Sequence, residues 1–291
     1  MMHSCLFRRI PSPGGMNVRL IVFGAGARME GAAAAARRAG WETLQVRSAE
    51  EEGEIGEYAD AVLLPWPVSF RDGKLAGTDM KTEAALSMIP RCRLLMHGAG
   101  LEAKTPQAQR RLNPERDEGF LTANALLTAE GAIARAMQRP GRALAGTAVL
   151  VAGFGRIAQA LTIRLCALGA FVIVCARSEA QMRRAHAMGA HPVPLSALNS
   201  AAAQAEVVFN TIPARVFSVE ALTAISRESL YIELASEPYG ADLEHAARMG
   251  VTVALESGLP GRYAPEDAGA ALFDALQRAW TQTERGGEGH E

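Results

Sequence analysis

The 291-residue sequence predicts an α/β protein made of two Rossmann-like, doubly wound parallel-sheet domains with an interdomain cleft. Two observations support this fold class. Short apolar, β-branched segments alternate with helix-like segments along the chain. Glycine-rich turns, at residues 24–26 and 153–155, each follow an apolar segment and precede a helix-like one. The length and the 49% content of hydrophobic residues suit two globular domains.

The first half of the chain predicts a domain over residues 16–122. Strands are expected at residues 18–23, 43–46, 61–64 and 94–97, and helices at 29–40 and 125–137. The first strand stops at Gly24 and the first helix ends at Gly40, because glycine readily adopts the conformations that end such elements. The third strand ends at Pro65, which cannot donate to a ladder. The second helix leads into the second domain.

The second half repeats the alternation over residues 123–267. Strands are expected at residues 148–152, 171–175, 207–211, 230–234 and 251–254, and helices at 157–168, 179–188, 219–224 and 241–249. Helical crossovers between strands favour parallel order, so we expect a second parallel sheet. A last amphipathic helix over residues 268–283 is expected to pack back on the first domain. Residues 284–291 are expected to be a disordered tail.

Composition excludes several classes of function. Thirty basic and 31 acidic side chains give a net charge of −1, without a basic stripe that would indicate a nucleic-acid partner. No apolar run reaches the roughly 18 residues of a membrane span. Residues 1–15 lack the apolar region of a signal peptide, so we expect a flexible extension. The four scattered cysteines suggest reduced thiols in a cytoplasmic protein, and the six histidines show no metal-ligand spacing.

The second glycine-rich turn predicts a dinucleotide site. Gly153 permits the tight turn, Gly155 lets the backbone approach a pyrophosphate, and Ala158 keeps the helix close to the strand. The candidate contacts of this turn are Gly153, Phe154, Gly155, Arg156 and Ile157. A Rossmann domain with an empty crevice, or with another nucleotide, is the alternative.

The end of the next strand decides which cofactor is expected. An NAD enzyme places a carboxylate there, whereas this chain has Arg177 and Ser178. Because a guanidinium can hold a 2′-phosphate, we expect NADP, with NAD possible through Glu179. Further candidate contacts follow later strands, where ligands lie in such sheets: Asn210, Thr211, Ile212, Pro213 and Ala235.

The first glycine-rich turn predicts an anion site instead. Residues 24–28 have the wrong spacing for a dinucleotide, since Met29 occupies the position of the third small residue. The free amides of a helix N-terminus and the Arg28 guanidinium would suit a carboxylated ligand. The alternative is that Arg28 forms an ordinary salt bridge.

A collinear set of motifs extends from about residue 18 to residue 275. They are the glycine-rich loop with Arg28, Leu64-Pro65-Trp66-Pro67-Val68-Ser69, Glu115-Arg116-Asp117, Asn124 with Thr128-Ala129-Glu130-Gly131, Gly153-Phe154-Gly155-Arg156, Ala176-Arg177-Ser178, Asn210-Thr211-Ile212-Pro213, Ala235-Ser236, and Gly258-Leu259-Pro260-Gly261 with Ala264-Pro265. By these motifs the chain resembles the family of the dehydrogenase-like A-subunit of dipicolinate synthase. It departs from the family at Gly26, where an Asp is usual, and at residues 237–240.

The resemblance implies a function. A dihydrodipicolinate-type ring from the lysine pathway is oxidised to dipicolinate (pyridine-2,6-dicarboxylate) with NADP as hydride acceptor, for sporulation. It also implies a partner, the flavoprotein-like B-subunit of dipicolinate synthase, and a cytoplasmic location in the mother cell of a spore-forming bacterium. We expect a small dicarboxylate substrate and a homo-oligomer, with neither a nucleic-acid nor a membrane partner.

Residues of the reaction are chosen by position. Substrate-binding candidates are Arg28, Ser69, Gly98 and Thr128, and catalytic candidates are His97, at a strand end, and Glu130, which we place at the start of the interdomain helix. Two other functions stay open: another NAD(P)-dependent hydroxyacid or amino-acid dehydrogenase, and a nucleotide-binding protein without catalysis. Residues 258–261 lack the histidine that 2-hydroxyacid oxidation needs as a base, which argues against the first.

Overall fold

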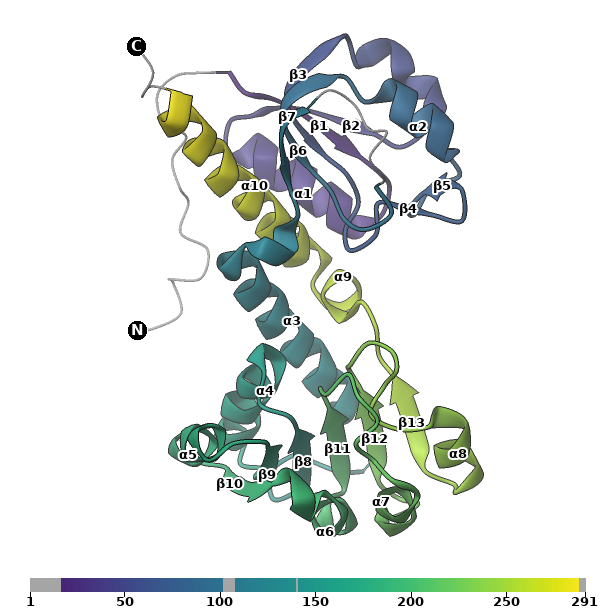
Figure 1. The fold of residues 1–291 in the computed structure, drawn as a ribbon, viewed down its shortest axis with the longest axis vertical. Helices are drawn as coiled ribbons and strands as arrows, with labels where there is room; N and C mark the ends of the chain where they lie inside the picture. The colour runs from purple at the N-terminus through teal and green to yellow at the C-terminus, as the bar shows by residue number, and fades with distance from the viewer. Residues whose placement is uncertain (1–16, 102–107, 140, 288–291) are drawn as a thin grey trace. The chain divides into compact units, whose positions relative to one another are not determined.

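The structure, a computed structural model, describes residues 17–101, 108–139 and 141–287 (Figure 1). The chain divides into two compact units. Unit 1 joins the residues up to Asn124 to those from Ala264 onward, and unit 2 spans Ala125–Tyr263. Each unit contains one parallel sheet with helices, so the predicted α/β class is confirmed.

Unit 1 is a five-stranded parallel sheet with strand order β2-β1-β3-β6-β7. Its strands are β1 (Arg19–Phe23), β2 (Glu42–Val46), β3 (Tyr58–Leu63), β6 (Arg91–Met96) and β7 (Ala108–Leu112), besides a short hairpin of β4 (Phe70–Arg71) and β5 (Lys74–Leu75). Its helices are α1 (Ala27–Arg38), η1 (Ala49–Glu54), α2 (Thr82–Met88), η2 (Pro114–Arg116), the first part of α3 (Glu118–Met137), and α10 (Pro265–Gly287). Alternate side chains of β1 enter two different cores: Leu20 packs with α1 and α10, whereas Ile21 packs with α2.

Helix α10 packs along α1, at the other end of the sequence (Figure 1). The two helices approach closely at glycines: a Cβ on Gly31 would lie 2.9 Å from the Pro265 carbonyl oxygen. The Trp41 ring stands edge-on to Phe273, with 5.1 Å between ring centroids. The helix runs to Gly287, four residues into the segment for which the sequence predicts disorder.

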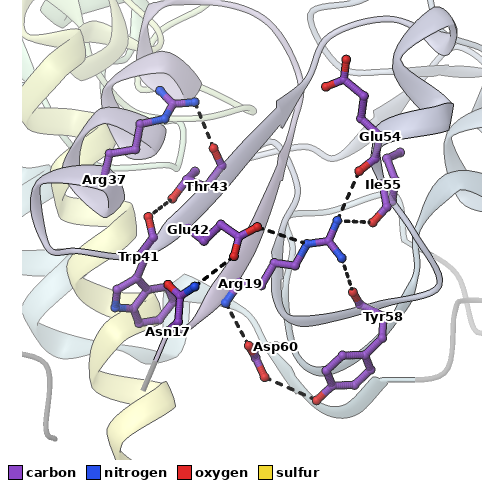
Figure 2. A network of polar contacts seen from close by, with 10 residues as sticks. All are labelled: Asn17, Arg19, Arg37, Trp41, Glu42, Thr43, Glu54, Ile55, Tyr58 and Asp60. Carbon is purple, nitrogen blue, oxygen red and sulfur yellow. Dashed lines mark hydrogen bonds and ion pairs between the residues drawn. The ribbon is translucent and has the colours of Figure 1, made fainter. Parts of the chain in front are cut away.

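The amino ends of β1 and β3 are held by a polar network (Figure 2). The Arg19 guanidinium donates hydrogen bonds to the carbonyl oxygens of Glu54 (3.2 Å), Ile55 (2.8 Å) and Tyr58 (3.1 Å), and the Arg19 amide donates to the Asp60 carboxylate (2.9 Å). Arg19 thereby caps the end of η1 and fastens it to the sheet. This edge lies opposite the carboxyl ends of the strands, where the candidate loops are.

Unit 2 is a six-stranded parallel sheet with strand order β10-β9-β8-β11-β12-β13. The strands are β8 (Ala148–Ala152), β9 (Phe171–Ala176), β10 (His191–Pro194), β11 (Val207–Asn210), β12 (Leu230–Glu233) and β13 (Thr252–Leu255). The helices are α4 (Arg156–Ala167), α5 (Glu179–Ala187), η3 (Leu195–Ala197), α6 (Leu198–Gln204), α7 (Val219–Ala224), α8 (Leu243–Arg248) and α9 (Leu259–Tyr263). Chain order reverses between β8 and β11, which makes their carboxyl ends the point where a doubly wound sheet binds ligands.

Several elements differ from the predictions. Helix α3 begins at Glu118, seven residues before the predicted start at residue 125, because the Asp117 side chain accepts a hydrogen bond from the Phe120 amide (2.6 Å) and caps it. Among the elements that the predicted ones do not include are β7, β10, α2, α6 and the β4–β5 hairpin. Within the described residues, no helix is long and apolar enough to cross a membrane, and no cluster of three metal-ligating side chains occurs.

Candidate cofactor and anion sites

The glycine turn after β8 has the geometry of a phosphate-binding loop. Gly153 has φ of +103°, and its amide donates to the Cys175 carbonyl oxygen (2.9 Å). A Cβ there would collide with Thr211 Oγ1 and lie 3.0 Å from Ile212 Cγ1, so a side chain is excluded. Gly155 caps α4, and a Cβ on it would meet no atom within 4 Å. The first amides of α4 therefore face open space, as an anion requires.

The side chains of this turn divide between core and surface. The Phe154 side chain is buried in the core of unit 2, so only its backbone remains for a ligand. Arg156 is exposed, at the first position of α4. Ile157 is half-buried and packs on the same core. The groups of this turn that an anion could reach are thus backbone amides and the exposed Arg156 side chain.

Arg177 and Ser178 follow β9 directly, as the sequence predicts. Arg177 is exposed, and its guanidinium contacts no acceptor in the part of the chain that the structure describes. Ser178 caps α5 in a capping box: its Oγ accepts from the Gln181 amide (3.3 Å). Its hydroxyl hydrogen is still available for a ligand. Glu179, the residue that would favour NAD, forms an ion pair with Arg183 (3.3 Å).

The polar groups of the loops after β11 and β12, predicted to contact the cofactor, form hydrogen bonds within the protein. Asn210 is fully buried, and its Nδ2 donates to the Glu233 carboxylate (2.7 Å). Thr211 donates its hydroxyl to the Ala152 carbonyl oxygen (2.8 Å), and the Ala235 amide donates to Glu233 (3.0 Å). All three groups are paired within the protein, but only Asn210 is fully buried, so only its prediction as a direct cofactor contact is corrected. Thr211, Ile212 and Ala235 are half-buried and Pro213 is exposed, so these four stay predicted contacts.

Glu233 itself was missed by sequence reasoning. It is the last residue of β12 and lies inside the predicted strand 230–234, where a carboxylate in an otherwise apolar run was the available signal. Its side chain is fully buried.

Arg28 lies at the start of α1, beside the loop that follows β3. Its Nη1 donates a long hydrogen bond to the Trp66 carbonyl oxygen (3.4 Å), and its guanidinium stands 5.2 Å from the centroid of the Trp66 ring. Its Nε is buried without a partner, and no carboxylate of the described residues pairs with it. Burial lowers the pKa of Arg28 to about 10. A half-buried cation beside a helix N-terminus that lacks a side-chain cap suits an anion.

Ser69 and Gly98 hold the loops of unit 1 together rather than facing a ligand. Ser69 is fully buried, donates its hydroxyl to the Pro65 carbonyl oxygen (2.8 Å) and accepts from the Gly98 amide (2.8 Å). A Cβ on Gly98 would collide with the Pro67 carbonyl oxygen. Both predicted substrate contacts are thus corrected to structural residues, because their polar groups are already paired and buried.

His97 and Glu130 have different surroundings. His97 follows β6, is half-buried, and its Nδ1 lies 2.8 Å from the Gly98 carbonyl oxygen. That contact favours a hydrogen on Nδ1 and leaves Nε2 as the basic atom. Glu130 lies in the middle of α3, not at its start, because the helix begins at Glu118. It is exposed and forms an ion pair with Arg164 (2.9 Å). Thr128, on the same helix, is buried.

Comparison with known proteins places these features in a family context. A model of the NAD-binding domain of D-isomer specific 2-hydroxyacid dehydrogenases matches residues 120–232, which contain the Gly153 turn and Arg177. The A-subunit of dipicolinate synthase from Bacillus subtilis (strain 168) is 31% identical over 239 residues, which cover 78% of this chain and 80% of that protein. The match to the NAD-binding domain supports a nicotinamide dinucleotide as the ligand of unit 2.

Solved structures agree on the fold. The crystal structure of the dipicolinate synthase A-subunit from Bacillus halodurans has a TM-score of 0.79 at 26% identity, and covers 91% of this chain and 99% of that chain. Salmonella D-lactate dehydrogenase has a TM-score of 0.55 at 14% identity, covering 90% of this chain and 96% of that chain. The second likeness shows the fold alone.

Proposed function

The chain belongs to the dipicolinate synthase A-subunit family, and from that premise we propose that it oxidises a dihydrodipicolinate-type ring to dipicolinate with NADP as hydride acceptor. Two hydrogens leave the ring. One leaves as a hydride to the nicotinamide and the other as a proton to a base, which yields an aromatic pyridine with both carboxylates retained. NADP, when bound, supplies the hydride acceptor.

The observation that carries the choice of NADP is the Arg177 guanidinium. It comes directly after β9, where an NAD enzyme has a carboxylate, and no acceptor of the described residues neutralises it. Ser178 lies beside it with a hydroxyl hydrogen to donate. Together they form a cationic, hydrogen-bonding group that suits a 2′-phosphate.

In unit 1, Arg28 is the proposed partner of a substrate carboxylate. Its half-buried guanidinium lacks an acidic partner among the described residues, and the amides of Ala27 and Arg28 begin α1. A dicarboxylate would supply the missing negative charge. Thr128, the other substrate contact that the sequence predicts, belongs to unit 2 and is buried there.

For the proton we propose His97 rather than Glu130. The Nδ1 contact with the Gly98 carbonyl leaves Nε2 of His97 free to accept a proton. The Glu130 carboxylate is instead paired with Arg164 on the surface. Aromatisation of the ring assists loss of the proton, so a strong base is not required.

The family name also motivates a partner. We propose that the chain works with the B-subunit of a dipicolinate synthase, in the cytoplasm of a spore-forming cell. The deciding assay mixes the purified chain with NADP and freshly generated dihydrodipicolinate, in the presence and absence of this partner, and follows NADPH and dipicolinate absorbance. Turnover of 2-hydroxy acids instead would favour another dehydrogenase, and dinucleotide binding without any turnover would favour a non-catalytic role.

Cofactor choice has its own test. Arg177→Ala should weaken NADP binding about 10- to 100-fold and leave NAD binding unchanged, because a hydrogen-bonded charge pair contributes roughly 1.5–3 kcal/mol. Arg183→Ala is the matched control, since this exposed arginine of α5 pairs with Glu179. Isothermal titration with both cofactors measures the effect. Equal loss of NAD and NADP binding in Arg177→Ala would contradict the assignment.

A further inference from the structure

Glu233 is a buried carboxylate whose surroundings are all hydrogen-bond donors. One oxygen accepts from Asn210 Nδ2 (2.7 Å) and from the Ala235 amide (3.0 Å), and the other from the Tyr231 hydroxyl (2.9 Å) and the Gly240 amide (2.9 Å). A carboxylate only accepts, so these four donors match it fully. No cation of the described residues pairs with it. Four hydrogen bonds therefore compensate for its burial.

The same carboxylate connects two loops that are separate in the sequence. Asn210, held by Glu233, donates to the Ile212 carbonyl oxygen (3.0 Å) and accepts from the Ile212 amide (3.1 Å). On the other side, the Gly240 carbonyl oxygen accepts from the Phe217 amide (2.9 Å). A Cβ on Gly240 would collide with the Asn210 amide, so the loops pack without space to spare. The Asn210 side chain thus connects Glu233 to the backbone of Ile212.

These loops belong to one half of the sheet. They follow β11 and β12, on the far side of the order reversal from the Gly153 turn and Arg177, which follow β8 and β9. A dinucleotide bound at such a reversal has one mononucleotide on each half. The adenosine half with its 2′-phosphate therefore belongs with β8 and β9, and the nicotinamide half with β11 and β12.

We infer that Glu233 is a positioning residue for the nicotinamide half of the cofactor site, acting through Asn210 on the backbone of residues 210–213 without touching the ligand. The inference rests on the proposed function, because it requires a nicotinamide dinucleotide in unit 2. Glu233→Gln keeps the size of the side chain but turns one oxygen into an NH₂ donor. That donor faces donors on either side of the carboxylate, so the connection between the loops loosens.

The experiment compares two ligands, NADPH and 2′,5′-ADP, which has the adenosine half and the 2′-phosphate but no nicotinamide. Isothermal titration measures both with the full chain. Glu233→Gln should weaken NADPH about tenfold or more and leave 2′,5′-ADP within about twofold of the wild type. Glu256→Gln is the matched control: its carboxylate follows β13, the neighbouring strand, and pairs with Arg135 (3.0 Å), away from residues 210–213. It should bind both ligands as the wild type does.

A second variant tests the inference if Glu233→Gln does not fold. Glu233→Asp keeps the charge and withdraws the oxygens by one methylene. It should therefore also weaken NADPH binding but not 2′,5′-ADP binding, and by a smaller factor than Glu233→Gln. Equal weakening of both ligands in a folded variant, or unchanged NADPH binding, would overturn the inference. A wild-type chain that binds neither ligand would refute the proposed cofactor itself, which is a separate result.

Discussion

Substitution of Gly269 by alanine is expected to destabilise unit 1 by disturbing the packing of α10 on α1. Gly269 lies in α10 where this helix crosses α1. A Cβ there would lie 2.6 Å from the carbonyl carbon of Gly31 and would collide with the Arg28 carbonyl oxygen and the Ala32 amide. All three obstacles are backbone atoms of a helix, so no side-chain rotation can relieve them.

The size of the effect follows from two opposing contributions. Overpacking of a close contact costs about 1–3 kcal/mol, and backbone obstacles place this site at the upper end. Alanine in place of glycine in a helix returns about 1 kcal/mol. The net loss in unfolding free energy is therefore about 2 kcal/mol, or roughly 4–8 °C in Tm for a unit of this size.

Tryptophan fluorescence reports on this unit alone. The three tryptophans of the sequence, Trp41, Trp66 and Trp280, all belong to unit 1, and the rings of Trp41 and Trp280 are 6.0 Å apart across the α1–α10 contact. Urea titration followed by tryptophan emission measures the loss. Gly53→Ala is the control, since a Cβ on Gly53 meets no atom within 4 Å. Equal urea midpoints for the two variants would refute the reasoning.

Two further predictions concern charged side chains of unit 1. Burial raises the pKa of Asp117. Hydrogen bonds from Arg278 (2.6 Å) and from the Phe120 amide lower it by more, so the net shift is downward. The stabilisation is thus present above the unfolded pKa of about 3.9 and is lost as the pH falls through the folded value. Asp117→Ala should lower the unfolding free energy by about 2 kcal/mol near neutral pH, and by less in acid. Urea titrations of the wild type and the variant at several pH values measure this. The prediction is contradicted if their difference in unfolding free energy does not change with pH. Arg28→Ala should weaken dipicolinate binding about tenfold or more by isothermal titration. Because burial lowers the pKa of Arg28 to about 10, wild-type affinity should also fall as the pH rises through that value; a flat profile up to that pH in the wild type would count against an Arg28 contact.

The central strands were predictable because both of their faces are buried. β8 is apolar throughout and β1 is apolar after Arg19; a glycine follows each, and this pattern has few alternative interpretations. β7 and β10 lie at sheet edges. β7 contains the polar sequence AQRRL and β10 contains two prolines, so neither shows the apolar pattern of a central strand. Both segments form strands because they pair with a neighbouring strand, β7 with β6 and β10 with β9, and not because of their own residue pattern.

The candidate site divides along similar lines. The Gly153 turn and Arg177 were found because their role depends on local backbone and on position after a strand. Ser69 and Asn210 were misread because sequence position does not reveal that a polar side chain is already paired inside the protein. Glu233 was missed for the same reason: its four donors come from residues up to 23 positions away.

Unit 1 is discontinuous in the sequence, whereas unit 2 is one uninterrupted segment. All residues of unit 2 therefore precede α10 in the chain, whereas unit 1 needs residues that are synthesised last. The sheet of unit 1 is made first but waits for α10, whose Leu272 and Leu276 cover the Leu20 face. A chain truncated after Tyr263 would therefore keep every residue of unit 2, while unit 1 would expose the apolar face that α10 covers.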